Sequence, residues 1–594
     1  MTRLLIASAP VRGRVTAGMV MLLVIVGLSW PLIATNSAMT QDWPNHLWYM
    51  WRQSLTIRSD GLPSIFLNAG GAVFYPFYGF YGGSLYSLGG VLSLLLGNAP
   101  VKAYILTWIL GFAAAYGGLY WLARMAGVGR WLSHAPALVY VTSPYILTLV
   151  YARGAWPEFM ATSAIPLFVA ASVQTLRDGR LRLGPSLALA LSTVILTGSH
   201  NITLLWGGTF IVLIAVLAIV CIPAARAMLA PGNVVRWCLV AAPSALVNAW
   251  FLLPALAYGS RIRIGSADWT PTLRLTSVFT SIARLFALSR GTSVVAGPRI
   301  SYSPDFSLAL PVLAIAWILL GGALAIRHGR RAGGVAFRRL LVVLAGVGTL
   351  FGLLLTNWRL IADLPGPYHL VQFPYRLETY VLLATSGAMI CVLALQRSEI
   401  AGRRALRALL VGVLAFSAIG AVEQVADYPN QFPNRNFVFA AQRQPPASVY
   451  DTGDYSDTTL PLIGPAGLAT ATFPQAVHDD RVRATFAVDP RQTLLQSNVR
   501  AAPYLVRVLG ATVVGRSLSG FMVLRLPTGH PRLVSLTVER ATSTPVELGR
   551  ALSAAGLLAL LALSCAGVVR ALRRASPPRV ELATPEATGG SLRP

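Results

Sequence analysis

The segment ITLLWGGTFIVLIAVLAIVCI, residues 202–222, contains no charged residue along its whole length. An α-helix of about 20 such residues crosses the hydrocarbon core of a bilayer, which is about 30 Å thick. Six other apolar runs reach or approach the same length: Met19–Ile33, Ala103–Leu122, Phe306–Ile326, Leu340–Leu355, Tyr380–Leu395 and Ala551–Val569. The sequence therefore predicts an integral membrane protein that crosses the bilayer several times.

The bulk composition agrees with this prediction. Hydrophobic residues make up 55% of the 594 residues, charged residues make up only 12%, and the mean hydropathy is +0.62. A soluble globular domain contains about 25% charged residues, so roughly half of the usual charged surface is missing. The four cysteines lie in or beside apolar runs, and no two of them have metal-ligand spacing.

The net charge of +27 comes almost entirely from arginine, because Lys102 is the only lysine. The arginines gather in short gaps between apolar runs, for example at 177–182, 327–339 and 570–574. This is the positive-inside pattern that orients membrane helices, whereas a nucleic-acid-binding surface would be clustered on one folded domain. We therefore expect no nucleic-acid partner, and we expect these gaps and both termini on the cytoplasmic side.

The same charge pattern divides the chain into twelve expected spanning helices. They lie near residues 15–35, 103–122, 133–150, 158–176, 183–199, 202–222, 237–257, 306–326, 340–356, 376–396, 407–422 and 550–570. Residues 77–96 are apolar but rich in Gly and Tyr, and a full span there would reverse every later loop. This segment is either re-entrant or a short helix pair, or else it is a thirteenth span with one poorly charged loop.

Hydropathy falls between Glu423 and Leu548, over a stretch too long for a simple connection. Alternating runs at 482–488, 504–508 and 520–526 are typical of β-strands. We expect an all-α polytopic membrane bundle of about 12–13 transmembrane helices, with a small external β-rich domain before the last helix. The expected parts are a membrane domain at 1–422 with an outer-face loop at 36–75, the external domain at 423–548, the final helix at 549–570 and a disordered cytoplasmic tail at 571–594.

The strongest local signal is QDWPNH, residues 41–46, directly after the first apolar run. Asp42 and His46 are four residues apart and share one face if the segment is helical. Beside a membrane surface, the pair could act as a general base and its orienting partner, or could hold a divalent metal. Alternatively, Asp42 only caps an amphipathic helix that has Pro44 in its first turn. The residues alone leave both interpretations open.

Further polar residues fall on the same expected side of the membrane. Arg153 and Glu158 lie in a short loop, where an arginine can bind a phosphate or the two side chains can simply pair with each other. His200 ends an expected helix, and a lone histidine there is often only a satisfied interfacial residue.

A later segment combines aromatic and ionisable residues at the start of an apolar span. Gln372, Arg376 and Glu378 lie there, and ionisable residues at membrane depth are functional by default, although Arg376 could also snorkel to the interface. An aromatic strip at 74–81 belongs to the same expected side. Such rings suit the headgroup level of a bilayer and also stack on sugars.

Several of these motifs resemble a bacterial integral-membrane family that is labelled 6-pyruvoyl-tetrahydropterin synthase-related. Leu62-Pro63, Gly70-Gly71 and the aromatic strip resemble its "LP…GG…FYPP" region, without the usual prolines at the end. Residues 371–376, VQFPYR, resemble its "QFPWR" signature, with Tyr375 in place of tryptophan. We expect no pterin chemistry, because the seven histidines are scattered and lack the closely spaced zinc-binding pair of pterin synthases.

The expected architecture also resembles the GT-C glycosyltransferase superfamily, whose many-spanning members take a sugar from a polyprenyl-phosphate donor. That resemblance implies an acidic catalytic residue in the first external loop, a position that Asp42 matches, with His46 as its neighbour. The residues expected to bind substrate are Arg153, Glu158, His200, Gln372, Arg376 and Glu378.

The resemblance also implies the partners and the location. The partners would be membrane lipids, a polyprenyl-phosphate-linked sugar and a glycan or lipid acceptor, on the outer face of a bacterial inner membrane. No cofactor follows from it, and a divalent metal is left open. The alternatives are a lipid or polysaccharide flippase or transporter, and a non-catalytic membrane scaffold.

Overall fold

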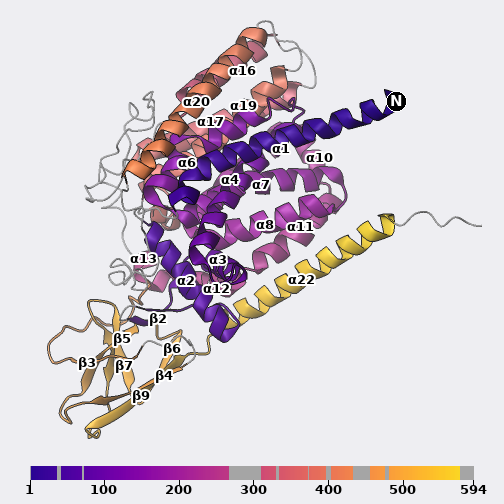
Figure 1. Ribbon diagram of the computed structural model, residues 1–594. Helices are drawn as coiled ribbons and strands as arrows, with labels where there is room; N and C mark the ends of the chain where they lie inside the picture. The colour runs from indigo at the N-terminus through magenta and orange to yellow at the C-terminus, as the bar shows by residue number, and fades with distance from the viewer. Residues whose placement is uncertain are drawn as a thin grey trace, which may run out of the picture.

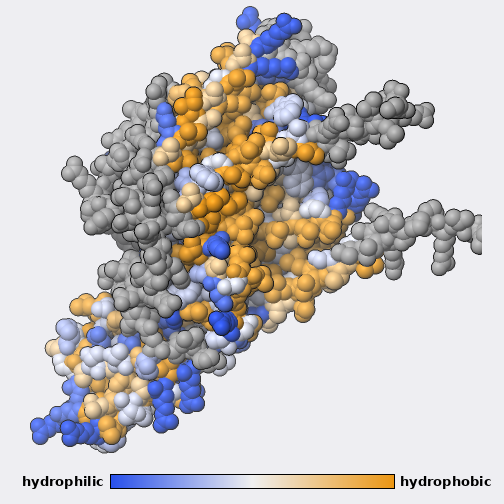
Figure 2. Space-filling view, viewed as in Figure 1, coloured by the Kyte–Doolittle hydropathy of each residue, from blue (hydrophilic) through white to orange (hydrophobic). Residues whose placement is uncertain are grey.

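The computed structural model describes residues 2–35, 42–69, 72–266, 310–328, 334–371, 373–396, 403–431, 455–474 and 481–575. These residues form a helical bundle with a β-rich module at one end, and the start of the first helix and the end of the last one lie away from that module (Figure 1). Apolar residues cover most of the helical surface in Figure 2, whereas hydrophilic residues gather on the module and at the opposite end of the bundle. A bilayer requires such an apolar belt between polar ends.

Eight helices in the described residues are long and apolar enough to cross a membrane. They belong to α1 (Thr2–Thr35), α4 (Pro100–Met125), α7 (Trp156–Asp178), α9 (Asn201–Cys221), α17 (Gly334–Thr356), α19 (Glu378–Gln396), α20 (Arg403–Gln431) and α22 (Thr544–Ala575). Two further spans are broken. One consists of α5 (His134–Val141), α6 (Pro144–Leu147) and η2 (Thr148–Arg153) and bends by 51°, and the other consists of α11 (Pro231–Leu246) and α12 (Ala249–Tyr258) and bends by 71°.

Three shorter apolar helices complete the bundle: α3 (Gly83–Leu95), α8 (Leu183–Ser199) and α16 (Val312–His328). Every expected span therefore coincides with a helix. Of the 12–13 spans that were expected, however, only eight to ten are long and apolar enough in the described residues to cross a membrane. Residues 77–96 form the turn η1 (Phe77–Gly79) and the 13-residue α3. That helix is only about 20 Å long, which is too short to span.

Short helical segments connect the longer ones. They are α10 (Pro223–Met228), η3 (Gly259–Arg261), α13 (Arg263–Ser266), α18 (Trp358–Ala362), η5 (Gly366–Val371) and η6 (Pro374–Leu377).

The segment expected as an outer loop at 36–75 contains regular structure from residue 43 onward. Helix α2 (Trp43–Asp60) packs against α3 and ends at Gly61, whose φ of 74° favours glycine. The strands β1 (Leu67–Ala69) and β2 (Ala72–Tyr75) follow. This segment is therefore a folded part of the molecule that joins the bundle to the β-rich module.

The β-rich region before the last helix is confirmed. Its strands are β3 (Ala469–Ala471), β4 (Arg481–Ala487), β5 (Leu494–Arg500), β6 (Val506–Leu509), β7 (Thr512–Arg516), β8 (Phe521–Arg525) and β9 (Leu533–Arg540). The alternating runs found in the sequence correspond to β4, β6 and β8. The boundaries differ from the expected ones, because α20 continues to Gln431 and α22 already begins at Thr544 and runs to Ala575. The expected disordered tail lies outside the described residues from 576 onward.

The strands form two sheets. One has the order β1-β2-β5-β8-β7 with β3 beside β5, and the other has the order β4-β9-β6. Strand β2 pairs in parallel with β5 through Val73 and Val499. The Arg500 guanidinium strengthens this junction by lying 5.1 Å from the centre of the Tyr75 ring. Two strands from the start of the chain therefore belong to the module.

Candidate functional site

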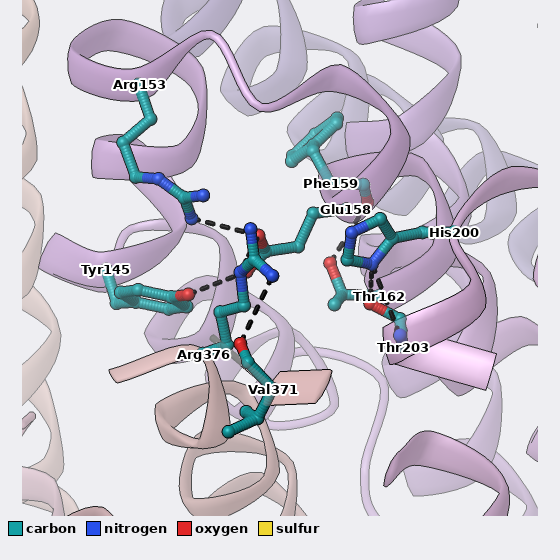
Figure 3. A network of polar contacts seen from close by, with 9 residues as sticks. All are labelled: Tyr145, Arg153, Glu158, Phe159, Thr162, His200, Thr203, Val371 and Arg376. Carbon is teal, nitrogen blue, oxygen red and sulfur yellow. Dashed lines mark hydrogen bonds and ion pairs between the residues drawn. The ribbon is translucent and has the colours of Figure 1, made fainter. Parts of the chain in front are cut away.

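Segments far apart in the sequence meet at helix ends and bring their ionisable side chains together. Asp42 precedes α2, Arg153 ends η2 and Glu158 lies in the first turn of α7. His200 lies between α8 and α9, and Arg376 lies in η6, directly before α19. Figure 3 shows the part of this group that surrounds Glu158.

Glu158 is the centre of a buried ion-pair network (Figure 3). Its Oε2 atom lies 2.9 Å from Nη1 of Arg153 and 3.3 Å from Nε of Arg376. Its Oε1 atom accepts a hydrogen bond of 2.7 Å from the Tyr145 hydroxyl. Glu158 and Arg153 are only 2% and 3% exposed, so these hydrogen bonds are needed to offset the loss of hydration. Of the two interpretations of Arg153 and Glu158, the structure shows their mutual ion pair, extended by Arg376.

Aromatic rings hold both arginines in position. The Arg153 guanidinium lies 5.1 Å from the centre of the Tyr375 ring, and that of Arg376 lies 5.2 Å from the centre of the Phe373 ring. Arg376 also donates to the Val371 carbonyl over 3.2 Å. Arg153 ends a π-helical segment, a rare conformation that often occurs at functional sites. Each of the two cations therefore has both an ion pair with Glu158 and an aromatic ring beside it.

Asp42 occupies the position of a helix cap, but its side chain makes no capping hydrogen bond to α2. Its backbone N–H donates to the Arg153 carbonyl over 2.8 Å, which ties the start of α2 to η2. The half-buried side chain has Arg153, Arg376 and Glu158 as its charged neighbours. Burial raises the pKa of the Asp42 carboxyl above its ordinary value, and the two arginines oppose that rise. The carboxylate thus does not cap α2, and its electrostatic surroundings are set by the charges of Arg153, Arg376 and Glu158.

His46 lies one turn further along α2 and is buried. Its Nδ1 atom is 2.6 Å from the Tyr86 hydroxyl. Burial, together with the charge of Arg153, lowers the pKa of His46 to about 3. The imidazole is therefore neutral near pH 7 and can orient a neighbouring group without adding another charge.

His200 caps the start of α9. Its Nδ1 atom accepts a hydrogen bond of 3.2 Å from the backbone N–H of Thr203. A nitrogen that accepts a hydrogen bond carries no proton, so the ring is neutral with its proton on Nε2. In Figure 3 the ring lies on the opposite side of Glu158 from Arg153. His200 therefore offers one N–H donor at the edge of the cluster.

Tyr81 lies between the two histidines and links their surroundings. Its ring stacks on His46 at a centroid distance of 6.5 Å and meets His200 edge-on at 5.7 Å. Residues 72–80 before it are buried, whereas Tyr81 is half-buried, and its hydroxyl makes no hydrogen bond within the described residues. The ring and the hydroxyl are thus open to a ligand beside Asp42 and Arg376, both of which act on the Tyr81 hydroxyl electrostatically.

The remaining two candidate residues are Glu378 and Gln372. Glu378 is completely buried, and neither of its carboxylate oxygens has a hydrogen-bond partner among the described residues. Gln372 lies outside the described residues. No group of three or more His, Cys, Asp or Glu side chains that could hold a metal ion occurs within the described part of the chain.

The sequence analysis missed two tyrosines of the cluster, Tyr145 and Tyr86, which contact Glu158 and His46. Tyr81, which contacts both histidines, is the last residue of the aromatic strip that the sequence analysis had named. A tyrosine inside an apolar run looks the same whether it packs in a core or contacts a site. The only signal in the sequence was the density of tyrosines in the aromatic strip.

No protein-family model and no curated protein matches this sequence, so the resemblance to the pterin synthase-related family finds no support. Among solved structures, the chain is similar to the arabinofuranosyltransferase AftD from mycobacteria, with 17% identity over 66% of this chain and a TM-score of 0.37. It spans only 27% of the AftD chain. It is also similar to ArnT from Cupriavidus metallidurans bound to undecaprenyl phosphate, with 12% identity, a TM-score of 0.28, and coverage of 87% of this chain and 98% of that one. Similarity at this level gives no information about the mechanism.

Proposed function

We propose that this protein is a membrane glycosyltransferase that takes a sugar from a polyprenyl-phosphate donor and transfers it to a cell-envelope acceptor. The observation that supports it is the Asp42 carboxylate, which makes no capping hydrogen bond to α2 and has Arg153 and Arg376 among its charged neighbours. Convergence of such groups from distant segments is typical of a ligand site and is not needed for a helix cap. A purely structural role for Asp42 does not account for this arrangement.

In the proposed reaction, Asp42 accepts the proton of an acceptor hydroxyl. The acceptor oxygen then attacks the anomeric carbon, and the bond between that carbon and the donor phosphate oxygen breaks with inversion. Negative charge develops on the departing polyprenyl phosphate, where Arg153 and Arg376 would stabilise it. Glu158 holds both guanidinium groups in place, so it acts as a positioning residue.

Binding of the donor phosphate tests this proposal directly. The purified protein should bind undecaprenyl phosphate at least tenfold more tightly than undecaprenol, because only the phosphate can pair with the arginines. Arg376→Gln should remove most of this difference, and Arg376→Lys should restore part of it. We would measure both ligands by native mass spectrometry and compare the thermal midpoints of the variants to confirm folding. Equal binding of the two ligands by the unmodified protein would contradict the proposed donor class.

Tyr81 provides a second test, because its open ring and hydroxyl can be removed separately. Tyr81→Phe should raise KM several-fold with a small change in kcat, since a neutral hydrogen bond contributes about 0.5–1.5 kcal/mol. Tyr81→Ala should lower kcat/KM by about ten- to a hundredfold, because it also removes stacking beside His46. Tyr120→Phe is a matched control on α4, away from this cluster. A Tyr81→Ala protein with unchanged kinetics would exclude Tyr81 from substrate binding.

A lipid or polysaccharide flippase is the second candidate. The broken span that ends at Arg153 favours it, because transporters often bind substrates at interrupted helices. The two functions differ in chemistry: a flippase moves the lipid-linked sugar intact, whereas a transferase releases polyprenyl phosphate. Chromatography of the lipid products from reconstituted protein separates them.

A further inference from the structure

Residues 455–459, which we call the strap, join the β module to the helical bundle. The strap is bonded on both sides of this junction through Ser456. Its carbonyl accepts a hydrogen bond of 3.0 Å from Arg263 N–H, which belongs to the short helix α13. Its hydroxyl donates over 3.0 Å to the carbonyl of Gly520, directly before β8. The backbone of the strap is therefore fixed to both parts of the molecule.

A buried ion pair adds to this attachment. The Asp457 side chain is completely buried, and its Oδ2 atom lies 2.9 Å from Nη2 of Arg261 in η3. The Arg261 guanidinium lies 4.7 Å from the centre of the Tyr504 ring in the module, and that ring stacks on Tyr258 at a centroid distance of 4.2 Å. Because separating the pair would leave a desolvated charge on Asp457, the strap has one well-defined position beside the bundle.

Tyr455, the first residue of the strap, packs against the aromatic strip at 74–81. Its ring lies parallel to the Phe80 ring at a centroid distance of 5.8 Å, with an angle of 6° between the planes. It also meets the Phe77 ring edge-on at 5.8 Å. Tyr455 is buried in this contact. The late part of the chain thus supplies a ring that completes the packing of the strip.

Phe77 connects this packing to the candidate site. Its ring centre lies 5.7 Å from that of Tyr81 and 5.6 Å from that of Tyr86. The Phe77 carbonyl also accepts a hydrogen bond of 3.0 Å from Tyr81 N–H. Tyr81 stacks beside His46, and the Tyr86 hydroxyl is bonded to the same histidine. Phe77 therefore lies between Tyr455 and the two tyrosines that contact His46.

We propose that Tyr455 is a positioning residue, which acts through Phe77 and Phe80 to fix the Tyr81 ring in the orientation that substrate binding requires. This inference rests on the proposed function, because it assigns Tyr81 to the substrate. A ring enclosed by close-packed neighbours is restricted to one rotamer. The module would in this way influence the reaction through a residue that is itself buried behind the site.

Fluorine NMR of the full-length protein in detergent, with fluorotyrosine in place of Tyr81, measures the order of this ring without any activity. One narrow line is expected for the unmodified strap and for Tyr455→Phe, which keeps the ring. Tyr455→Leu should broaden or split the line, because Tyr81 then populates further rotamers. Tyr455→Met, which keeps more of the buried volume, replaces Tyr455→Leu if that variant has a lowered thermal midpoint.

Phe486→Leu is the matched control, since it removes a ring that packs on Phe473 inside the module. The Tyr81 line should stay narrow in this variant. A narrow line in both Tyr455→Leu and Tyr455→Met, or equal broadening in Phe486→Leu, would overturn the proposal.

A double-mutant cycle on sugar transfer is the kinetic test. Tyr455→Leu should lower kcat/KM by about two- to tenfold, the range that one aromatic pair contributes, and Tyr455→Phe should restore most of it. In a Tyr81→Ala background, Tyr455→Leu should change kcat/KM by less than about twofold, because its effect passes through Tyr81. Equal losses in both backgrounds would show general support of the fold and would contradict positioning. If the unmodified protein transfers no sugar, the proposed function fails, and the NMR measurement alone decides whether Tyr455 orders Tyr81.

Discussion

Asp42→Asn should reduce glycosyl transfer by about 10²–10⁴-fold, the usual cost of removing a general base. The substitution changes little in shape, and the original carboxylate makes no capping hydrogen bond that the fold would lose. Donor binding should therefore survive while turnover is lost. The measurement is the release of polyprenyl phosphate by the reconstituted protein, with kcat and KM determined separately.

Asp60→Asn is the matched control, because Asp60 is an exposed residue at the other end of α2; its turnover should be unchanged. The pH profile is an independent readout. A protonated carboxyl cannot accept a proton, so turnover should fall as the pH drops through the Asp42 pKa, which burial raises above its ordinary 3.8. Retention of more than a tenth of the turnover by Asp42→Asn would rule out the general-base role.

Glu158→Gln should be the most destabilising of these substitutions, lowering the free energy of unfolding by about 3–5 kcal/mol. It leaves the buried Arg153 and the largely buried Arg376 without the carboxylate that both contact. Loss of one partner from a buried ion pair is costly because the remaining charge stays desolvated. The thermal midpoint and the urea dependence of the detergent-solubilised protein would report the loss.

Glu547→Gln provides the comparison, since it makes the same chemical change in a carboxylate that is 51% exposed. An exposed ion pair contributes only about 0–1 kcal/mol, so this variant should melt close to the unmodified protein. If the two variants lose the same stability, the network around Glu158 does not hold the helix ends together. Donor binding should also weaken in Glu158→Gln, because the arginines lose their fixed orientation.

Strands of the β-rich region could also be predicted from the sequence, because the signal for a strand lies within a few consecutive residues. Alternation of apolar and polar residues marks β4, β6 and β8 because successive side chains in a strand point to opposite sides. The same reasoning could not find the pairing of β2 with β5, because Val73 and Val499 are far apart in the sequence and become neighbours only when the chain folds. Short strands such as β2 are also buried on both sides, which removes the alternating pattern.

The membrane class and the places of the helices could be predicted from the sequence alone, because bilayer thickness acts on about 20 consecutive residues. Which polar residues meet became visible only in the folded molecule. It placed Asp42 under the electrostatic influence of Arg153, Arg376 and Glu158, and it left Glu378, two residues from Arg376, without a hydrogen-bond partner among the described residues. Successive residues of a helix point about 100° apart, so neighbours in sequence can face different surroundings while distant residues share one. The packing of helix ends, which no local pattern encodes, assembles the candidate site.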